Sequence, residues 1–362
     1  MRRRSRPTGF SLPDRCGGLP IVAARATARS LLALPARLLA PSRHDETLLA
    51  YAYLLPAFVI LGLFSGFALL FGLWVSLFDW GPRGGPFIGL RNYVLLLQDP
   101  AFWQSLQVTV FYVLLVVPAQ LGLGLVVAVL LHRPMRGRGL LRLLYFLPHI
   151  TSLVAAGLVF RWIFSPGAGV VNALYQLAGV PPPMWLQEST GVVALAAQAV
   201  GIQVPDALGG PSLALVVVAL TTVWYWVGLD AVIFLAGLAA NPAELYEAAR
   251  IDGAGGWASF RRITLPLLTP TLYALATIVV IGAFQAFTVV FAMTGSGYGN
   301  VGSSGAPLGT TRLITLFIVD EFYRFAHVGY AMSAAIALFA IVLSITFVQL
   351  RTVGRRVFYL GD

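Results

Sequence analysis

Long apolar stretches alternate with short polar segments along the chain, at residues 51–78, 105–131, 142–164, 212–239, 267–293 and 328–350. Each has about 20 or more mostly apolar residues, the length of helix that crosses the hydrocarbon core of a membrane. Prolines inside them are tolerated, because neighbouring helices can satisfy the freed backbone groups. The first stretch has no polar turn between Tyr51 and Phe78 and is counted as one tilted helix. The pattern predicts an all-α polytopic membrane protein with six transmembrane helices.

The composition agrees with this pattern and limits the chemistry. Hydrophobic residues make up 58% of the 362 residues and charged residues 10%, whereas a soluble domain carries roughly 25% charged residues. The net charge of +10 comes from arginine alone, since the sequence contains no lysine. A P-loop needs a lysine on the phosphates and Schiff-base catalysis needs a lysine nucleophile, so this chain alone provides neither. Cys16 is the sole cysteine, which excludes an internal disulfide and a cysteine-based metal site.

The arginines indicate the orientation, because cytoplasmic loops of membrane proteins carry an excess of positive charge. They concentrate in the N-terminal tail, at residues 133–142, at residues 250–262 and after residue 350. The opposite side has only Arg83, Arg91, Arg161, Arg312 and Arg324. Both termini are therefore expected in the cytoplasm, with a basic tail at 1–46, a membrane domain at 47–350 and a C-terminal tail at 351–362.

The N-terminal tail allows two interpretations. Residues 19–40 mix arginines with leucines and alanines, which suits a basic helix lying in the membrane interface. The alternative is a disordered tail that only enforces the orientation. A cleaved secretory signal is not expected, because arginines and prolines interrupt the apolar residues.

The polar loop at 241–266 has the signals of a short ordered helix. Asn241 is expected at the N-cap, with Pro242 at the first helical position and Glu244 reaching back as in a capping box. The helix is expected to run to about Ile251 and to end at Gly253. A second short helix is expected at 257–263, before the next span. A plain connection between two spans would need neither a capped helix nor a second short helix after it. The loop therefore predicts a docking surface for another protein.

Small and charged side chains define that surface. Ala248 and Ala249 are expected to leave one face of the helix nearly flat, so that a partner's backbone can approach closely. Glu247, Arg250 and Asp252 place charge around this patch.

The spacing of these residues resembles a known motif. The sequence Glu247-Ala248-Ala249, then Gly253, then Ile263-x-Leu265-Pro266 looks like the EAA motif of ABC-importer permeases. From about residue 51 to residue 351 the chain is similar to the carbohydrate-uptake permeases of the maltose, multiple-sugar and glycerol-3-phosphate type. The resemblance implies the type I ABC-importer permease fold. It also implies that the EAA helix contacts the ATPase through the coupling residues Glu247, Ala248, Ala249, Asp252, Gly253, Ala254, Leu265 and Pro266.

The resemblance further implies the partners. These are a second homologous permease, an ABC ATPase dimer that binds ATP and Mg²⁺, and an extracytoplasmic solute-binding protein, all at the inner membrane of a bacterium or an archaeon. The chain itself is expected to bind no cofactor, no metal and no nucleic acid, and to have no ATPase site.

Two segments depart from the family pattern. The family usually has Met-Thr-Gly-Gly-Gly-Pro-Gly-Asn after the fifth span, where this chain has Met-Thr-Gly-Ser-Gly-Tyr-Gly-Asn at 293–300. The external segment at 187–211 is also longer than usual and contains an apolar stretch, 191–202, that is too short to span. It is either an external helix that contacts the binding protein or a surface addition.

Polar residues inside the spans are candidates for the substrate path, because such groups are costly in lipid and usually face the bundle interior. Asp230 lies near Trp226 and Trp224 in the fourth span, and a carboxylate beside indole rings suits a sugar. Gln285 and Thr288 share a face of the fifth span, and the family has amide side chains there. Gln120 is a weaker candidate. Each of these residues has the alternative role of bonding one helix to another.

Two other classes of protein are weighed against a permease. A membrane-embedded transferase would need several carboxylates or histidines at one membrane face. The external carboxylates are scattered in the sequence, and His149 and His327 are expected at helix interfaces. An ion-coupled secondary transporter could use Asp230, but it leaves the loop unexplained and no inverted repeat is visible. The external carboxylates are Asp79, Asp99, Glu188, Asp206, Asp320 and Glu321.

The nature of the cargo has two possibilities at this point. No arginine lies in the middle of a span to bind a phosphate, which favours a neutral carbohydrate. Arg161, near the external end of the third span, keeps a polyol phosphate such as glycerol 3-phosphate possible.

Overall fold

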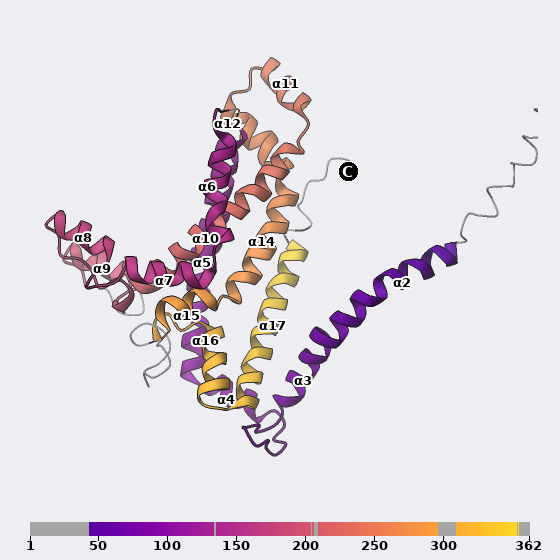
Figure 1. Ribbon diagram of the computed structural model, residues 1–362, viewed down its shortest axis with the longest axis vertical. Coiled ribbons are helices and arrows are strands. Elements are labelled where there is room, and N and C mark those ends of the chain that lie inside the picture. Colours follow the sequence, from indigo (N-terminus) through magenta and orange to yellow (C-terminus); the bar gives the residue numbers. More distant parts are fainter. Residues whose placement is uncertain are drawn as a thin grey trace, which may run out of the picture. The chain divides into compact units, whose positions relative to one another are not determined.

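The computed structural model describes residues 43–133, 135–203, 205, 209–295, 309–352 and 354 (Figure 1). Most of the predicted N-terminal tail lies outside the described residues, as do Cys16, Asp206, residues 296–300 of the departing motif and nearly all of the C-terminal tail. The chain forms two units, residues 1–68 and residues 69–362.

The first unit contains the N-terminal helix. This helix comprises α2 (Arg43–Leu61) and the π-helical turn η2 (Gly62–Gly66), and it continues as α3 (Phe67–Val75), which extends into the second unit. Together they form a candidate membrane span at Leu49–Val75. The first predicted span is therefore a single helix that ends three residues earlier than expected.

Three more predicted spans are uninterrupted helices of the second unit. They are α5 (Pro100–His132), which follows the short α4 (Arg91–Gln98), then α10 (Leu213–Ala239) and α17 (Val328–Thr352). Side-chain caps fix the first residues of two of them. Asp99 Oδ1 accepts a hydrogen bond from the backbone of Ala101 at 2.8 Å, and Ser212 Oγ accepts one from Leu215 at 3.1 Å.

The third predicted span is not one helix. It consists of α6 (Arg138–Ile150) and α7 (Leu153–Ile163), which meet at 95°. The intervening Thr151 and Ser152 have extended backbones. The Tyr225 hydroxyl of α10 lies 3.2 Å from the carbonyl oxygen of His149 and 3.0 Å from that of Thr151. The bend is tolerated because a neighbouring helix bonds the backbone groups that it frees.

The fifth predicted span is also interrupted. The segment that ends in α13 (Leu265–Leu267) meets α14 (Thr269–Phe284) at 65°, and a second break at residues 285–287 precedes α15 (Thr288–Thr294). Phe287 at this break has φ −137° and ψ −58°, outside the helical region. In the described part of the chain, four helices are long and apolar enough to cross a membrane, or up to six if each bent pair is one span.

Short elements connect these helices. The side predicted to be external has α8 (Val170–Leu177), η3 (Trp185–Gln187), α9 (Val192–Ala199), α16 (Ile314–Val319) and η7 (Asp320–Arg324). The apolar part of the predicted external segment is therefore the short helix α9. The loop at 241–266 contains α11 (Ala243–Ile251), α12 (Gly256–Ser259) and η5 (Phe260–Thr264).

Within the second unit α10 contacts α5, α6 and α14, while α15 contacts α7 (Figure 1). Glycines occupy the tightest crossings. A Cβ atom on Gly157 would lie 2.8 Å from the Cβ of Ala292, which joins α7 to α15. Small residues allow such close approach between membrane helices. The buried core includes the large side chains Tyr112, Phe234 and Phe317.

Candidate functional site

The loop at 241–266 begins its helix differently from the expectation. Pro242, with φ −62° and ψ 129°, occupies the cap position of α11, and no side chain caps the helix. The predicted capping box of Asn241 and Glu244 is therefore wrong, because the extended Pro242 moves Asn241 one residue further from the helix. Instead, Asn241 Nδ2 donates to the Tyr246 hydroxyl at 3.1 Å.

The end of α11 agrees with the expectation. Gly253 has φ +75°, which a residue with a side chain adopts only at a cost. Its N–H donates to the Arg250 carbonyl at 3.1 Å, and the N–H of Ala254 donates to the Ala249 carbonyl at 2.8 Å. These paired bonds are a Schellman motif. Gly253 thus ends the helix.

The EAA residues do not all face outward. Glu247, Ala248 and Asp252 are exposed, whereas Ala249 is 8% exposed. Consecutive residues of an α-helix lie about 100° apart around its axis, so neighbouring alanines cannot share one surface fully. The flat exposed surface is therefore formed by Ala248, and Ala249 packs inside the loop. Ala254, Leu265 and Pro266 are half-buried.

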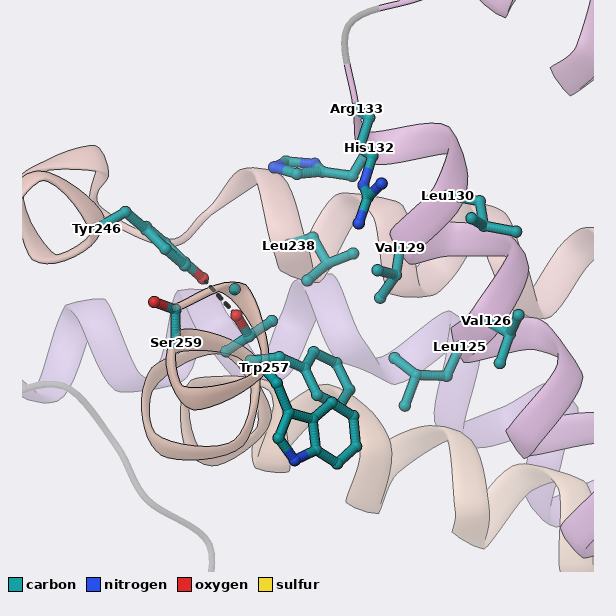
Figure 2. Close-up of a pocket in the computed structure, with 13 residues that line it drawn as sticks. Leu125, Val126, Val129, Leu130, His132, Arg133, Leu238, Tyr246, Trp257 and Ser259 are labelled. Carbon is teal, nitrogen blue, oxygen red and sulfur yellow. Dashed lines mark hydrogen bonds between the residues drawn. The ribbon is translucent and has the colours of Figure 1, made fainter. Parts of the chain in front are cut away.

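A tyrosine joins the two halves of the loop. The Tyr246 hydroxyl in α11 lies 3.1 Å from Thr264 Oγ1 at the end of η5 (Figure 2). Beside this contact is a cavity of about 660 Å³ between the loop and the C-terminal ends of α5 and α10. Figure 2 shows Tyr246 on the loop side and Val129 of α5 on the opposite side. The Tyr246–Thr264 contact thereby joins α11 to the end of η5 within the loop. The cavity is lined by Leu125, Val126, Val129, Leu130, His132, Arg133, Leu238, Tyr246, Gly256, Trp257, Ser259, Phe260 and Thr264.

A second cavity, of about 270 Å³, lies among α5, α10, α14 and α15. It brings together five residues that the sequence placed in or near the substrate path. They come from three different predicted spans. These residues are Gln120, Trp226, Asp230, Gln285 and Thr288.

Asp230 is the most deeply buried of the five, at 2% exposure. The Gln120 side chain interacts with its carboxyl group, but Oδ2 is buried without a hydrogen-bond partner. Gly124 of α5 lies opposite, since a Cβ there would be 3.0 Å from the Cβ of Asp230. A buried polar atom without a partner is uncommon and calls for a physical explanation.

Two further polar residues of this cavity were missed. The hydroxyl groups of Tyr112 in α5 and Thr222 in α10 are 2.8 Å apart, and both residues line the cavity. Thr222, Trp226 and Asp230 follow one another at intervals of four residues, which places them on one face of a helix. This spacing was the available signal for Thr222.

Trp224 does not reach the cavity, contrary to the expectation. Its ring contacts the ring of Phe160 in α7 at a centroid distance of 4.9 Å, and 41% of the residue is exposed. Two residues correspond to about 200° around a helix, so Trp224 and Trp226 face nearly opposite ways. Trp226 instead contacts the His149 ring at 4.8 Å, which agrees with an interface role for that histidine.

The break between α14 and α15 lies at the same cavity. Gln285, Ala286 and Phe287 all line it. The freed carbonyl of Ala286 accepts a hydrogen bond from Thr315 Oγ1. Irregular backbone at membrane depth is tolerated where it is buried in protein or lines a hydrated cavity, and interrupted helices surround the substrate sites of many transporters.

The carboxylates that were predicted to be external are scattered in sequence but partly gathered in space. Asp79, Asp99 and Glu321 line one pocket of about 440 Å³ together with His327 and Tyr330. The Tyr330 hydroxyl donates to Asp99 Oδ2 at 2.7 Å, and His327 Nδ1 lies 3.1 Å from Glu321 Oε2. The first contact joins α17 to the start of α5.

Ion pairs lie next to this pocket. Asp320 lies 3.4 Å from Arg312 and 3.3 Å from Arg324, while Glu321 lies 3.9 Å from Arg312. Within the described ranges, no group of three or more histidines, cysteines or carboxylates is arranged to hold a metal ion.

Comparisons with known proteins identify the family of the chain. Residues 46–359 match the family described as "Binding-protein-dependent transport system inner membrane component". The chain is 31% identical to the sulfoquinovosyl glycerol transport system permease protein of Agrobacterium fabrum, over 85% of this chain and 91% of that protein. It is 30% identical to the trehalose/maltose transport system permease protein of Thermococcus litoralis, over 86% of this chain and 96% of that protein.

The fold is similar to that of a solved transporter. The structure of a bacterial alginate ABC transporter, in complex with an alginate pentasaccharide-bound periplasmic protein, contains a chain that matches with a TM-score of 0.67 and 21% identity. The match covers 86% of this chain and 95% of that one. The resemblance noted at the EAA residues is thus confirmed at the level of the family. This chain belongs to the family of binding-protein-dependent transport system inner membrane components.

Proposed function

We propose that the chain forms one half of the membrane pathway of an ATP-driven importer for a sugar or an oligosaccharide. A second related permease would complete the pathway, and an external solute-binding protein would deliver the cargo. An ATPase pair, which binds ATP and Mg²⁺, would contact the loops from the cytoplasm, where both termini would also lie. The family and the solved transporter with its periplasmic protein support this kind of assembly.

A helical connection between the loop and the membrane cavity is the observation that carries the proposal. α14 has 16 residues, which corresponds to about 24 Å at 1.5 Å per residue. It follows η5 and α13 at the loop across a bend of 65°, and it ends at Phe284, next to Gln285 in the cavity. A displacement of the loop is thereby passed along one helix to the place where the cargo would sit.

The loop offers the ATPase an exposed edge. Glu247, Ala248 and Asp252 face outward, while the Tyr246–Thr264 contact joins α11 to the segment that leads into α14. ATP-driven closure would pull the two permeases' loops together. The cavity would then change from an inward-facing to an outward-facing state.

The cavity favours a sugar as cargo. Amide, hydroxyl and indole groups among apolar walls are typical of a site that orients a small polar molecule. The relatives named above transport trehalose or maltose and sulfoquinovosyl glycerol, and alginate is described as an acidic polysaccharide. Arg161, which kept a polyol phosphate possible, is exposed and is not among the residues lining this cavity.

The first test is purification of the chain from its native membrane with mass spectrometry of the accompanying proteins. Recovery with an ATPase and a second permease is expected. If the chain is recovered alone or only with itself, the importer proposal fails and a membrane-embedded transferase or a secondary transporter must be considered.

A second test addresses the loop. Glu247→Ala should abolish transport-linked ATP hydrolysis while the complex still assembles. Glu244→Ala is the matched control, because Glu244 is exposed on the same helix but lies outside the EAA residues. If uptake by the Glu247→Ala variant is unchanged, Glu247 is not one of the residues that couple the chain to the ATPase.

A further inference from the structure

We propose that the cavity beside the loop at 241–266 binds an anionic phospholipid of the surrounding membrane. One acyl chain lies between the loop and the C-terminal ends of α5 and α10, and the phosphate group contacts Arg133 and His132. The inference concerns a lipid site and depends on neither the cargo nor the ATPase. It uses only the membrane location of the chain, which its family provides.

The first reason is the apolar lining of this cavity. α5 contributes Leu125 and Val129, α10 contributes Leu238, and the loop contributes Trp257 and Phe260. The volume of about 660 Å³ lies within the range of about 300–1,000 Å³ that is usual for pockets that hold a small molecule. The cavity therefore has the size and the lining to hold part of a lipid molecule.

The second reason is that the cavity is open at apolar residues. Val126, Leu130 and Trp257 are 54%, 51% and 73% exposed. Two hydroxyl groups on the loop side, those of Tyr246 and Thr264, are 3.1 Å apart and satisfy each other. An exposed apolar patch of this kind marks contact with a membrane or with another protein. An acyl chain can enter the cavity through this opening.

The third reason is the charge at one end of the cavity. The apolar run of α5 ends at Leu131, and His132 and Arg133 follow it directly and line the cavity. Figure 2 shows Arg133 above the apolar residues and Trp257 below them. Among the described residues, no carboxylate lines the cavity, and neither His132 nor Arg133 is in an ion pair. The cationic end is therefore available to an anion at the level where the apolar helix ends.

The two ends of the cavity together match the two parts of an anionic phospholipid. Basic pockets between transmembrane helices bind anionic lipid headgroups, and an acyl chain in the apolar part gains the packing contacts that an empty cavity lacks. A water-soluble anion would use only the charged end. A lipid without net charge would be attracted less strongly by Arg133. The complete site therefore favours a lipid such as phosphatidylglycerol.

The test uses the transporter purified in detergent with the subunits that accompany the chain. Native mass spectrometry measures bound lipid during titration with dioleoyl phosphatidylglycerol or with dioleoyl phosphatidylcholine. Phosphatidylglycerol should bind more tightly. Arg133→Gln should weaken its binding by about fivefold, the effect of one arginine near an anionic headgroup, and should change phosphatidylcholine binding much less. Val129→Trp fills the cavity and should weaken binding of both lipids.

Two variants outside the cavity are the matched controls. Arg142→Gln controls for charge, because Arg142 is exposed on α6 and does not line the cavity. Leu123→Trp controls for bulk, because Leu123 is exposed on α5 and also lies outside the cavity. Both should leave lipid binding unchanged.

Three results would overturn the inference. An equal loss of phosphatidylglycerol binding in Arg142→Gln and Arg133→Gln would show general attraction to a basic surface. Unchanged binding in Val129→Trp would show that no acyl chain enters the cavity. Binding to the isolated chain that disappears in the assembled transporter would show that a partner subunit covers the cavity.

Discussion

Gly228 in α10 and the carbonyl oxygen of Tyr145 in α6 are in direct backbone contact, because a Cβ atom on Gly228 would lie 1.8 Å from that oxygen. The helix α6 therefore crosses α10 without any intervening side chain. The crossing lies two residues before Asp230 in the sequence. It fixes α6 against the helix that contributes the carboxylate to the membrane cavity.

Gly228→Ala should destabilise the protein. The added methyl group cannot fit without moving α6, and overpacking of this kind typically costs about 1–3 kcal/mol. Thermal denaturation of the purified protein in detergent should show a lower Tm. Gly122→Ala is the control, since a Cβ at Gly122 meets nothing within 4 Å. Equal Tm values for the two variants would contradict the close crossing.

Gly253→Ala should weaken coupling between ATP hydrolysis and transport. Alanine at φ +75° costs about 1 kcal/mol, which favours unwinding the end of α11 and displacing the exposed EAA residues. The measurement is sugar transported per ATP hydrolysed. Gly255→Ala serves as the control, since Gly255 has φ −67° and open space around it. If Gly253→Ala and Gly255→Ala transported the same amount of sugar per ATP hydrolysed, the helix end at Gly253 would have no role in coupling.

Tyr246→Phe should separate ATP hydrolysis from uptake. The substitution removes the hydroxyl that contacts both Asn241 and Thr264, and each such bond contributes about 0.5–1.5 kcal/mol. Without the Tyr246–Thr264 contact, the loop can move without moving α14. ATP hydrolysis should therefore persist while uptake falls several-fold. A double-mutant cycle with Thr264→Val isolates the pair. If the effects of the two substitutions on uptake simply add, the contact does not transmit the movement of the loop to α14.

The two tryptophans of α10 should differ in their effect on uptake. Trp226→Ala removes an indole that lines the cavity and should raise the sugar concentration needed for half-maximal uptake by several-fold. Trp224→Ala, on the face that contacts Phe160, should change it by less than about twofold once expression is corrected, because surface changes are usually small. The reverse order would place the cargo on the other face of α10.

Several features follow from local sequence alone. Long apolar runs without a polar turn produced α5, α10 and α17 as continuous helices, because every backbone polar group in lipid must be bonded within the segment. Gly253 ends α11 where the sequence placed the stop, since a positive φ at a helix end favours glycine regardless of its surroundings. The EAA spacing likewise indicates the family by itself, because all the residues of the motif lie within one short loop.

Other features depend on contacts between distant segments. Hydrophobicity cannot indicate the bend at Thr151, because the bend depends on a hydroxyl from Tyr225 in another helix. The rotation of a helix also decides which residues face inward, so Trp224 and Ala249 lie elsewhere than expected.

The membrane cavity likewise depends partly on the local sequence and partly on contacts between distant segments. The sequence determined which polar residues lie inside the spans, since their cost in lipid makes them conspicuous. Only the tertiary structure decided that Gln120, Asp230 and Gln285 meet at one cavity, and that one oxygen of Asp230 stays unpaired there. The reason is that each residue belongs to a different helix, and the packing of those helices, fixed at glycine contacts such as Gly124, sets their rotation and depth.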